Sequence, residues 1–512
     1  MDEERSKENL IEKDYDADVL IVGYGAAGAN AAIAAHDAGA RVVIVEKLSS
    51  GGGNSAVCAG GMVIPQSLEA AIGYYRALSS GTVSDEMICA FAEAMLGIPD
   101  LLSRLGLEFI TEPPIPASFP SMSDSKLKVI HINPTGENGF RFLEGQVKDR
   151  KIEVLTDAQV KTLIQNSETR EVLGVKAQRK GRDIRLLARK GVILTCGGYA
   201  SNPAMLANFN CPGATDYIFS WGSPGNTGDG ISLASEAGAA LWHMAAIEWG
   251  RFCAREPSKK FGTAIGYGLG RTKRAGSYMF VNKFGERFMA EDTRLSHCKA
   301  QLDILRYDHD KGEYRNLPAF MIFDQSYLSG GPIAPTAQML QTKRGGIVGY
   351  SLVHNIYDWS VDNQAEIDEG WVLQAKTVAD LAHKIGSETD VLEETIRKFN
   401  RACAERCDSQ FGRNGNTLLP FETPPYFAVE LGLSVVNTQG GPKRNVNGQV
   451  LDHNDGVIPR LYAAGELGSF FGFLYQVGSN YPEAWAFGQI AGKMAAAETP
   501  LSKCPPYFHV PG

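Results

Sequence analysis

Two stretches of the sequence carry residue types whose spacing could do chemistry. The first is Gly23-Tyr-Gly25-Ala-Ala-Gly28, a glycine-rich turn of the kind that brings backbone N–H groups close to phosphates. The second is GELGSFFGFLYQVGSNYPEAWAFG, residues 465–488, in which Leu467 to Pro482 includes no Lys, Arg, His, Asp or Glu. The second stretch is either a core segment or one wall of a site for an uncharged substrate.

The elements around the glycine-rich turn indicate what it binds. An apolar run at 17–22 predicts a buried strand before the turn, and an alanine-rich run at 29–38 predicts a helix after it. A second strand at 41–45 ends at Glu46. A strand, spaced glycines, a helix and an acid at the tip of the next strand are typical of a dinucleotide-binding βαβ unit.

Each residue of this unit has an expected role. Gly23 permits the tight turn, Gly25 lets the backbone approach a pyrophosphate, and Gly28 lets the helix pack on the strand. The N-terminus of the helix offers N–H groups and a partial positive charge to the phosphates. Glu46 would accept hydrogen bonds from the adenosine ribose hydroxyls.

Glycine motifs that return far along the chain favour a flavin over a nicotinamide. They lie at 51–61, at 191–199, at 225–230 and again from Gly465. A nicotinamide domain would be contiguous, whereas one long cofactor touched by distant segments points to FAD. The predicted cofactor-binding residues are Gly23, Gly25, Ala26, Ala27, Gly28, Glu46, Lys47, Gly53, Asn54, Ser55, Gly60, Gly61, Gly197, Gly198, Asp229, Gly465, Glu466 and Asn480.

Five motifs in this order resemble the fumarate reductase and 3-ketosteroid dehydrogenase family of FAD flavoproteins. They are DADVLIVGYGAAGANAAIAA, GGGNSAVCAGG, TCGGYASN, TGDGISLASEAGA and LYAAGELG. The resemblance implies an α/β fold in which a Rossmann-like FAD-binding domain carries an inserted α+β cap domain. The expected division is 1–240 and 431–512 for the FAD-binding domain and 241–430 for the cap; an independent second domain is the alternative for the middle segment.

The cap segment holds the residues that the resemblance connects with proton transfer. A predicted hairpin at 277–289 is similar to the family's NxxGxRF element, and Arg294 then matches the arginine that donates a proton in fumarate reductases. Arg274 matches a second arginine of that proton relay, but the relay's glutamate falls on Arg271. Tyr327, after the predicted strand at 319–323, lies in a place similar to the acid/base tyrosine of ketosteroid dehydrogenases. A surface ion pair for Arg294 and a buried, structural Tyr327 are the alternatives.

The uncharged stretch argues against a dicarboxylate substrate. Fumarate reductases carry there a His and an Arg that bind the substrate's carboxylates; here the Arg position falls on Gln476 and the His position in a gap beside Phe471. Tyr475 and Gly478 instead resemble the pair whose hydroxyl and backbone N–H polarise the ketone of a ketosteroid. Two fixed donors at that oxygen would form an oxyanion hole. The predicted apolar pocket walls are Phe470, Phe471, Phe473 and Leu474, with aromatic packing beneath the flavin as the alternative.

A helix predicted at 482–494 completes this wall. Pro482 lies in its first turn, where proline is favoured. The resemblance implies that the N-terminus of this helix faces the flavin pyrimidine ring, where the helix dipole would stabilise the reduced anion.

These residues predict an FAD-dependent oxidoreductase acting on a C–C or C=C bond next to a ketone of a bulky apolar substrate, such as a 3-oxosteroid or a bile-acid-like compound. Tyr475, Tyr327, Arg294 and Gly478 are the candidate catalytic residues. The alternatives are reduction of another organic acceptor (a polyphenol metabolite, urocanate or a fumarate-type enoate) and an electron-transfer subunit without its own substrate. A single dinucleotide fingerprint predicts a separate electron donor or acceptor.

Composition excludes several other classes. The net charge of −8 over 512 residues makes nucleic-acid binding improbable on electrostatic grounds. Nine scattered cysteines fit a reducing compartment better than a disulfide framework, and they show no metal-site spacing. The sequence has no apolar run of about 18 residues, the length of a membrane span, and no signal-peptide pattern at its N-terminus. We therefore expect a cytoplasmic protein without a metal ion.

Overall fold

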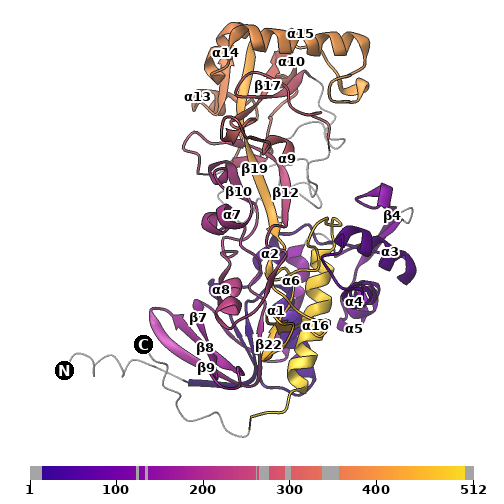
Figure 1. The fold of residues 1–512 in the computed structure, drawn as a ribbon, viewed down its shortest axis with the longest axis vertical. Helices are drawn as coiled ribbons and strands as arrows, with labels where there is room; N and C mark the ends of the chain where they lie inside the picture. The colour runs from indigo at the N-terminus through magenta and orange to yellow at the C-terminus, as the bar shows by residue number, and fades with distance from the viewer. Residues whose placement is uncertain are drawn as a thin grey trace, which may run out of the picture.

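The computed structural model describes residues 14–122, 126–132, 136–260, 262–264, 276–293, 301–336 and 357–501. The chain is elongated, as Figure 1 shows, with one large sheet toward the lower end of its long axis and a second large sheet above it. The long strand β19 (Tyr426–Thr438), which belongs to the second sheet, runs along that axis.

The first sheet is the dinucleotide-binding sheet. Its order is β21-β22-β9-β1-β2-β6, with β8 paired to β9 and β7 paired to β8. Strands β22, β9, β1, β2 and β6 are parallel neighbours, while the β7–β8–β9 meander and β21 are antiparallel. The strands are β1 (Asp14–Val22), β2 (Val42–Val45), β6 (Glu153–Leu155), β7 (Ala158–Gln165), β8 (Val172–Arg179), β9 (Arg182–Leu194), β21 (Gln449–Leu451) and β22 (Val457–Ala463).

Two apolar helices from opposite ends of the chain pack against each other beside this sheet (Figure 1). They are α1 (Ala26–Asp37) and α16 (Asn480–Ala497), and nearly all residues of α1 are buried. Small residues allow the close approach: a Cβ on Gly488 would lie 2.5 Å from the carbonyl oxygen of Ala27, and one on Gly492 2.3 Å from that of Ala31.

A small three-stranded sheet stands beside the glycine-rich loops. Its order is β3-β5-β4, formed by β3 (Gly61–Ile64), β5 (Leu127–His131) and β4 (Ile110–Ile115). The neighbouring helices are α2 (Gly53–Val57), α3 (Leu68–Ser79), α4 (Asp85–Leu96), α5 (Ile98–Leu105), η1 (Pro120–Met122) and α6 (Gly136–Asp149).

The second large sheet forms the region predicted as a cap. Its order is β13-β12-β19-β17-β14, and β10 and β18 also pair with β19. The strands are β10 (Ile218–Ser220), β12 (Ile247–Arg255), β13 (Gly262–Ala264), β14 (Tyr278–Asn282), β17 (Ala319–Asp324) and β18 (Val372–Ala375). Because β10 and the end of β19 belong to this sheet, it extends past both ends of the predicted 241–430 range, and the domain boundaries stay a prediction.

Shorter elements complete the described chain. They are α7 (Pro203–Phe209), η2 (Thr215–Tyr217), α8 (Asp229–Glu236), α9 (Gln301–Ile304), α10 (Gln325–Leu328), α13 (Gln364–Asp368), α14 (Val378–Ile385), α15 (Thr389–Glu405), η3 (Gly415–Thr417), β11 (Leu241–Trp242), β15 (Tyr307–Asp308), β16 (Glu313–Tyr314) and β20 (Gly441–Pro442). The predicted α/β class with a Rossmann-like sheet is confirmed.

The expected hairpin at 277–289 is present only in part. Strand β14 forms as predicted, and the turn closes through a hydrogen bond from Asn282 N to Glu286 O. Its second arm contributes a single bridge, between Val281 and Arg287, because the Arg287 side chain is held in a buried ion-pair network instead.

Candidate active site

A cavity of about 1070 Å³ lies where the parallel strands of the first sheet end. Val22, Val45, Thr195 and Ala464, at or just beyond the carboxyl ends of β1, β2, β9 and β22, all line it. This edge of an open α/β sheet is where such folds bind their ligands. The predicted cofactor residues that line it are Gly23, Gly25, Ala26, Ala27, Glu46, Lys47, Gly53, Asn54, Ser55, Gly60, Gly61, Gly197, Asp229, Glu466 and Asn480.

The glycine-rich turn has the geometry that its spacing predicted. Gly23 has φ +103°, and a Cβ there would lie 2.5 Å from the carbonyl oxygen of Thr195. Gly25 is the N-cap of α1, so the N-terminus of that helix opens into the cavity. The Ser55 hydroxyl accepts a hydrogen bond from Ala26 N at 3.0 Å, which ties the second glycine loop to the first.

Three predicted cofactor residues do not line the cavity and act through packing. Gly28 lies where a Cβ would be 2.1 Å from the carbonyl oxygen of Gly23. A Cβ on Gly198 would meet the Thr438 hydroxyl at 2.1 Å, and one on Gly465 would meet the Ala27 Cβ at 2.8 Å. These glycines let segments of the cofactor site approach one another.

Replacing Gly28 by Ala is expected to abolish FAD retention, because the methyl group and the Gly23 carbonyl cannot both keep their places. Gly145→Ala is the matched control, since no atom lies within 4 Å of a Cβ at that helical position. The flavin absorbance of the two purified variants measures the effect. A Gly28→Ala protein as yellow as the control would contradict it.

Two backbone N–H groups fix the side chain of Glu46. Its two carboxylate oxygens accept hydrogen bonds of 2.8 Å from Tyr24 N and Leu48 N. Burial raises the pKa of this carboxyl, and these backbone donors oppose the rise. The neighbouring Lys47 forms an ion pair of 3.0 Å with Asp229, so the two predicted cofactor residues lie together on the wall.

Glu466 is the centre of a second polar cluster. Its carboxylate accepts hydrogen bonds from the Asn54 side chain at 2.8 Å, from Asn226 at 3.3 Å and from Thr438 N at 3.3 Å. Complete burial raises the pKa of this carboxyl to about 7. A carboxyl of this kind can accept from, or when protonated donate to, a cofactor's hydroxyls.

The Glu466 carboxyl gives the FAD-free protein a defined pH dependence. Its pKa in the folded protein, about 7, exceeds the ordinary value of 4.5, so the folded state binds more protons than the unfolded state between these values. The free energy of unfolding therefore falls as pH rises through this window. The thermal unfolding midpoint of FAD-free Glu466→Gln should therefore depend less on pH in this window than that of wild type. A pH dependence identical to wild type would contradict the assignment.

The other part of the cavity is mainly apolar. Val63, Ile115, Val129, Trp221 and Val477 line it, from β3, β4, β5, the segment after β10 and the turn before α16. A bulky apolar molecule could bury its surface against these side chains, and such burial favours binding roughly in proportion to the apolar area removed from water.

Tyr475 and Gly478 both line the cavity, as predicted. The phenol oxygen of Tyr475 accepts hydrogen bonds of 3.1 Å from Ser479 N and Asn480 N, the first N–H groups of α16. Two such donors and the positive end of the helix dipole stabilise negative charge on the oxygen, which makes the hydroxyl a stronger donor. Gly478 has φ +82°, and its carbonyl accepts from Val63 N at 2.9 Å.

The aromatic residues of this segment have a different role from the one predicted. Phe470, Phe471, Phe473 and Leu474 do not line the cavity. Phe470 stacks on Phe91 with ring centroids 4.1 Å apart, and Phe471 packs edge-on against Tyr475 at 4.9 Å. Phe473 is 48% exposed. The prediction that these residues wall the pocket is therefore wrong. Phe470 and Phe471 pack in the core instead, against the aromatic side chains of α3 and α4.

Gln476 is a structural residue. Its side-chain oxygen accepts from the Tyr74 hydroxyl at 2.8 Å and from Ser118 N at 2.9 Å, and its amide nitrogen donates to Val477 O. Gln476 is 2% exposed and is not part of the cavity wall. The place that carries a substrate-binding Arg in fumarate reductases is thus occupied by a buried neutral amide.

One predicted catalytic residue, Tyr327, lies away from the cavity wall. Tyr327 is fully buried between Phe323 and Tyr278, with ring centroids 5.4 and 5.2 Å away, and does not line the cavity. Its role in proton transfer stays a prediction that this position does not support. Arg294, with Arg271 and Arg274, lies outside the described residues.

The cavity wall also has polar residues that the sequence did not single out. His131 and Glu112 line it from neighbouring strands, and Arg251 lines it from β12. Asp292 and Thr417 line it from the cap. No sequence motif marks these residues. Among the described residues, no group of three or more His, Cys, Asp or Glu side chains is placed to hold a metal ion.

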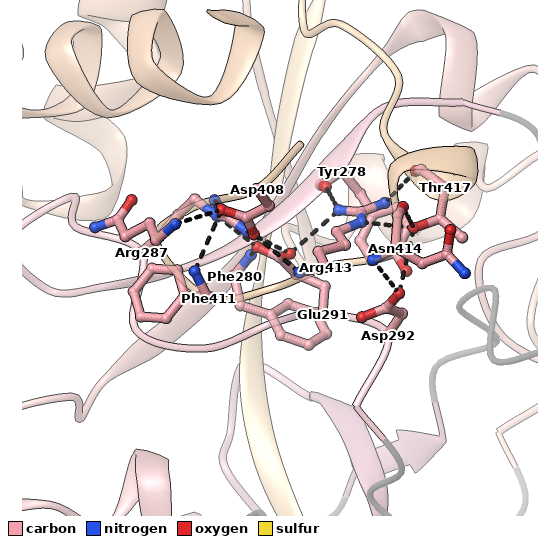
Figure 2. Close-up of polar contacts among 11 residues, drawn as sticks. Tyr278, Phe280, Arg287, Glu291, Asp292, Asp408, Phe411, Arg413, Asn414 and Thr417 are labelled. Carbon is pink, nitrogen blue, oxygen red and sulfur yellow. Dashed lines mark hydrogen bonds and ion pairs between the residues drawn. The ribbon is translucent and has the colours of Figure 1, made fainter. Parts of the chain in front are cut away.

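A buried network of charges fixes the cap part of the wall (Figure 2). Glu291 accepts from Arg287 through both carboxylate oxygens at 2.8 Å and from Arg413 at 3.2 Å, and Arg287 also bonds Asp408 at 2.9 Å. All four side chains are at most 2% exposed. Burial lowers the pKa of Arg287, but the hydrogen bonds and charges of Glu291 and Asp408 outweigh this and raise it.

The network reaches the cavity through the residues next to it. Arg413 donates to the backbone oxygens of Tyr278 at 2.8 Å and Thr417 at 2.7 Å. Asp292 follows Glu291 directly and accepts from Asn414 N at 2.8 Å. As Figure 2 shows, these contacts join the segment after β14 to the loop before η3.

The model of the FAD-binding domain family matches residues 18–481. The chain belongs to this family. FAD is therefore its cofactor, and the residues present fit it: a helix N-terminus for the phosphates, Glu46 for the ribose, and glycines where a Cβ would fill the space. The family assignment also confirms the FAD oxidoreductase class predicted from the motifs.

Relatives with assigned activities differ in substrate. The chain is 28% identical to the probable fumarate reductase Ifc3 of Shewanella frigidimarina, covering 93% of this chain and 74% of Ifc3. It is 26% identical to a 3-oxosteroid 1-dehydrogenase of Mycolicibacterium smegmatis, covering 95% and 98%. The NADH:fumarate oxidoreductase of Klebsiella pneumoniae is 26% identical, but the chain spans only 48% of its length.

Solved structures agree on the fold. A 3-ketosteroid Δ1-dehydrogenase from Sterolibacterium denitrificans, in complex with 1,4-androstadiene-3,17-dione, matches with a TM-score of 0.77 at 21% identity, covering 94% of this chain and 99% of that chain. The open form of a flavocytochrome c3 fumarate reductase matches with a TM-score of 0.68 at 25% identity, covering 97% and 81%. The overall fold is thus shared with both. None of the helices in the described part of this chain combines the length and apolar character that a membrane span requires.

Proposed function

We propose that this protein oxidises or reduces a C–C bond next to a ketone in a bulky, mostly apolar molecule, with 3-oxosteroids and bile-acid-like compounds as the leading class. The observation that carries the proposal is the position of Tyr475 and Gly478 on the apolar part of the cofactor cavity. No charged residue of the 465–488 segment other than Glu466 lines that cavity.

The chain's own residues account for the chemistry of the ketone. FAD, when bound, would exchange a hydride with the carbon β to the carbonyl. Tyr475 Oη–H and Gly478 N–H would donate to the carbonyl oxygen, where negative charge develops. The amides of Ser479 and Asn480 would hold the phenol oxygen during the reaction, since both bond it already.

One observation favours a second candidate, reduction of an enoate such as urocanate or a fumarate-type acid. Arg251, on β12, lines the same cavity and carries a guanidinium. A guanidinium is the group best suited to a carboxylate. In either case, electrons would come from or go to a separate donor or acceptor.

The two candidates are separated by anaerobic reoxidation. The purified flavoprotein is reduced and mixed separately with a 3-oxo-4-ene steroid, with urocanate and with fumarate, while the flavin absorbance is followed. Faster reoxidation by the steroid supports the proposal. Reoxidation by urocanate or fumarate that is lost in an Arg251→Gln variant would mean that the substrate is an enoate rather than a ketone. No reoxidation by any of the three compounds would favour an electron-transfer protein.

A further inference from the structure

His131 and Glu112 form a polar pair next to the apolar residues of the cavity wall. His131 ends β5 and Glu112 lies in β4, and the imidazole Nε2 is 3.6 Å from a carboxylate oxygen of Glu112. Both side chains line the cavity, and they are 31% and 51% exposed to solvent. The mechanism above gives this pair no role, although a partly exposed imidazole beside a carboxylate is well suited to proton transfer.

The cofactor loop makes room for the imidazole. Gly61 pairs directly with His131 across β3 and β5, and a Cβ at Gly61 would lie 3.1 Å from the imidazole Cε1. Gly61 is also one of the predicted flavin-binding residues on the cavity wall. The ring therefore lies against the backbone of the segment that approaches the cofactor.

The same strand joins His131 to the ketone-binding pair. Val63, two residues beyond Gly61, donates its N–H to the carbonyl of Gly478 at 2.9 Å, and Val63 pairs with Val129. Directly paired residues and those two apart share one face of a sheet. With a rise of about 3.4 Å per residue, His131 lies roughly 7 Å along this wall from the contact with Gly478.

We infer that His131 is the acid/base residue that moves the proton at the carbon α to the ketone, with Glu112 as its positioning residue; this rests on the proposed function. A separation of about 7 Å accommodates a carbonyl oxygen and its α carbon, two bonds apart, with contacts of about 3 Å at each end. In the oxidative direction, the α C–H bond breaks, its proton joins an imidazole nitrogen, and the electron pair moves toward the oxygen held by Tyr475 and Gly478. In the reductive direction, the same proton returns to the α carbon.

Deuterium exchange isolates this step. Reduced holoenzyme cannot accept a hydride, so a saturated 3-oxosteroid in D₂O can only exchange its α hydrogens, which mass spectrometry counts. Wild type should accelerate exchange over buffer. His131→Gln should lose that acceleration about 100-fold or more, and Glu112→Gln less than about fivefold. His383→Gln, an exposed histidine on α14, is the matched control and should exchange like wild type.

Two further measurements separate catalysis from folding. His131→Gln should keep its flavin absorbance and its thermal unfolding midpoint, and added imidazole should restore exchange in His131→Ala. Exchange by His131→Gln within threefold of wild type would overturn the inference while leaving the proposed function in place. A wild-type enzyme that neither exchanges nor turns over the steroid would instead overturn the proposed function.

Discussion

Replacing Tyr475 by Phe is expected to lower turnover of a 3-oxo-4-ene steroid by about 10²- to 10³-fold, the usual effect of losing one donor to a developing oxyanion. The ring and its packing on Phe471 are kept, so FAD binding should not change. Single-turnover kinetics of flavin reoxidation measure the effect on the chemical step.

A control variant separates the hydroxyl's catalytic role from its structural one. The phenol oxygen also accepts from Ser479 N and Asn480 N, so Tyr475→Phe removes two hydrogen bonds at the N-terminus of α16. Gln476→Glu or Tyr74→Phe alters the same turn without touching the cavity wall. Equal losses in Tyr475→Phe and Tyr74→Phe would show that the turn's structure, rather than the hydroxyl, is what matters.

Replacing Glu291 by Gln is expected to destabilise the protein by about 3–5 kcal/mol, because removing one partner from a buried ion network leaves uncompensated charge. Arg287 would then keep the Asp408 carboxylate, but the Arg413 guanidinium would lose its ion pair with Glu291 among side chains at most 2% exposed. Chemical denaturation, followed by tryptophan fluorescence, measures the loss.

The matched control is an exposed ion pair with the same i, i+4 spacing. Glu137→Gln removes the partner of Arg141 on α6, where both side chains are well exposed, and should cost less than about 1 kcal/mol. If both variants lost the same small amount, the network of Figure 2 would not be what holds Asp292 and Thr417 on the cavity wall.

The nucleotide part of the site could be predicted because its signals are local. Gly23, Gly25 and Gly28 act within one turn, and their spacing alone indicates the strand, the helix and the close approach that the structure shows. The return of glycine motifs at distant positions predicted that several segments would share one cofactor, and residues from all of these segments line one cavity.

The substrate part could not be predicted in the same way, because strand pairing and tertiary packing decide it. His131 and Glu112 meet because β4 pairs with β5 in a register that places Ile110 opposite His131 and Glu112 opposite Val129. Phe470 does not line the cavity as predicted, because its ring stacks on Phe91 of α4, which is far away in the sequence. Within one short segment, aromatic side chains therefore serve as core, as Phe470 does, or as site, as Tyr475 does, according to partners that no local pattern reveals.

The most direct test of the central claim is the carbonyl stretching frequency of a ¹³C-labelled 3-oxosteroid bound to the oxidised protein, measured by infrared difference spectroscopy. Donation from Tyr475 Oη–H and Gly478 N–H weakens the C=O bond, so the band should lie below its position in an apolar solvent and shift back part of the way in Tyr475→Phe. A steroid that binds with an unshifted band, or with the same shift in Tyr475→Phe, would contradict the ketone-polarising site.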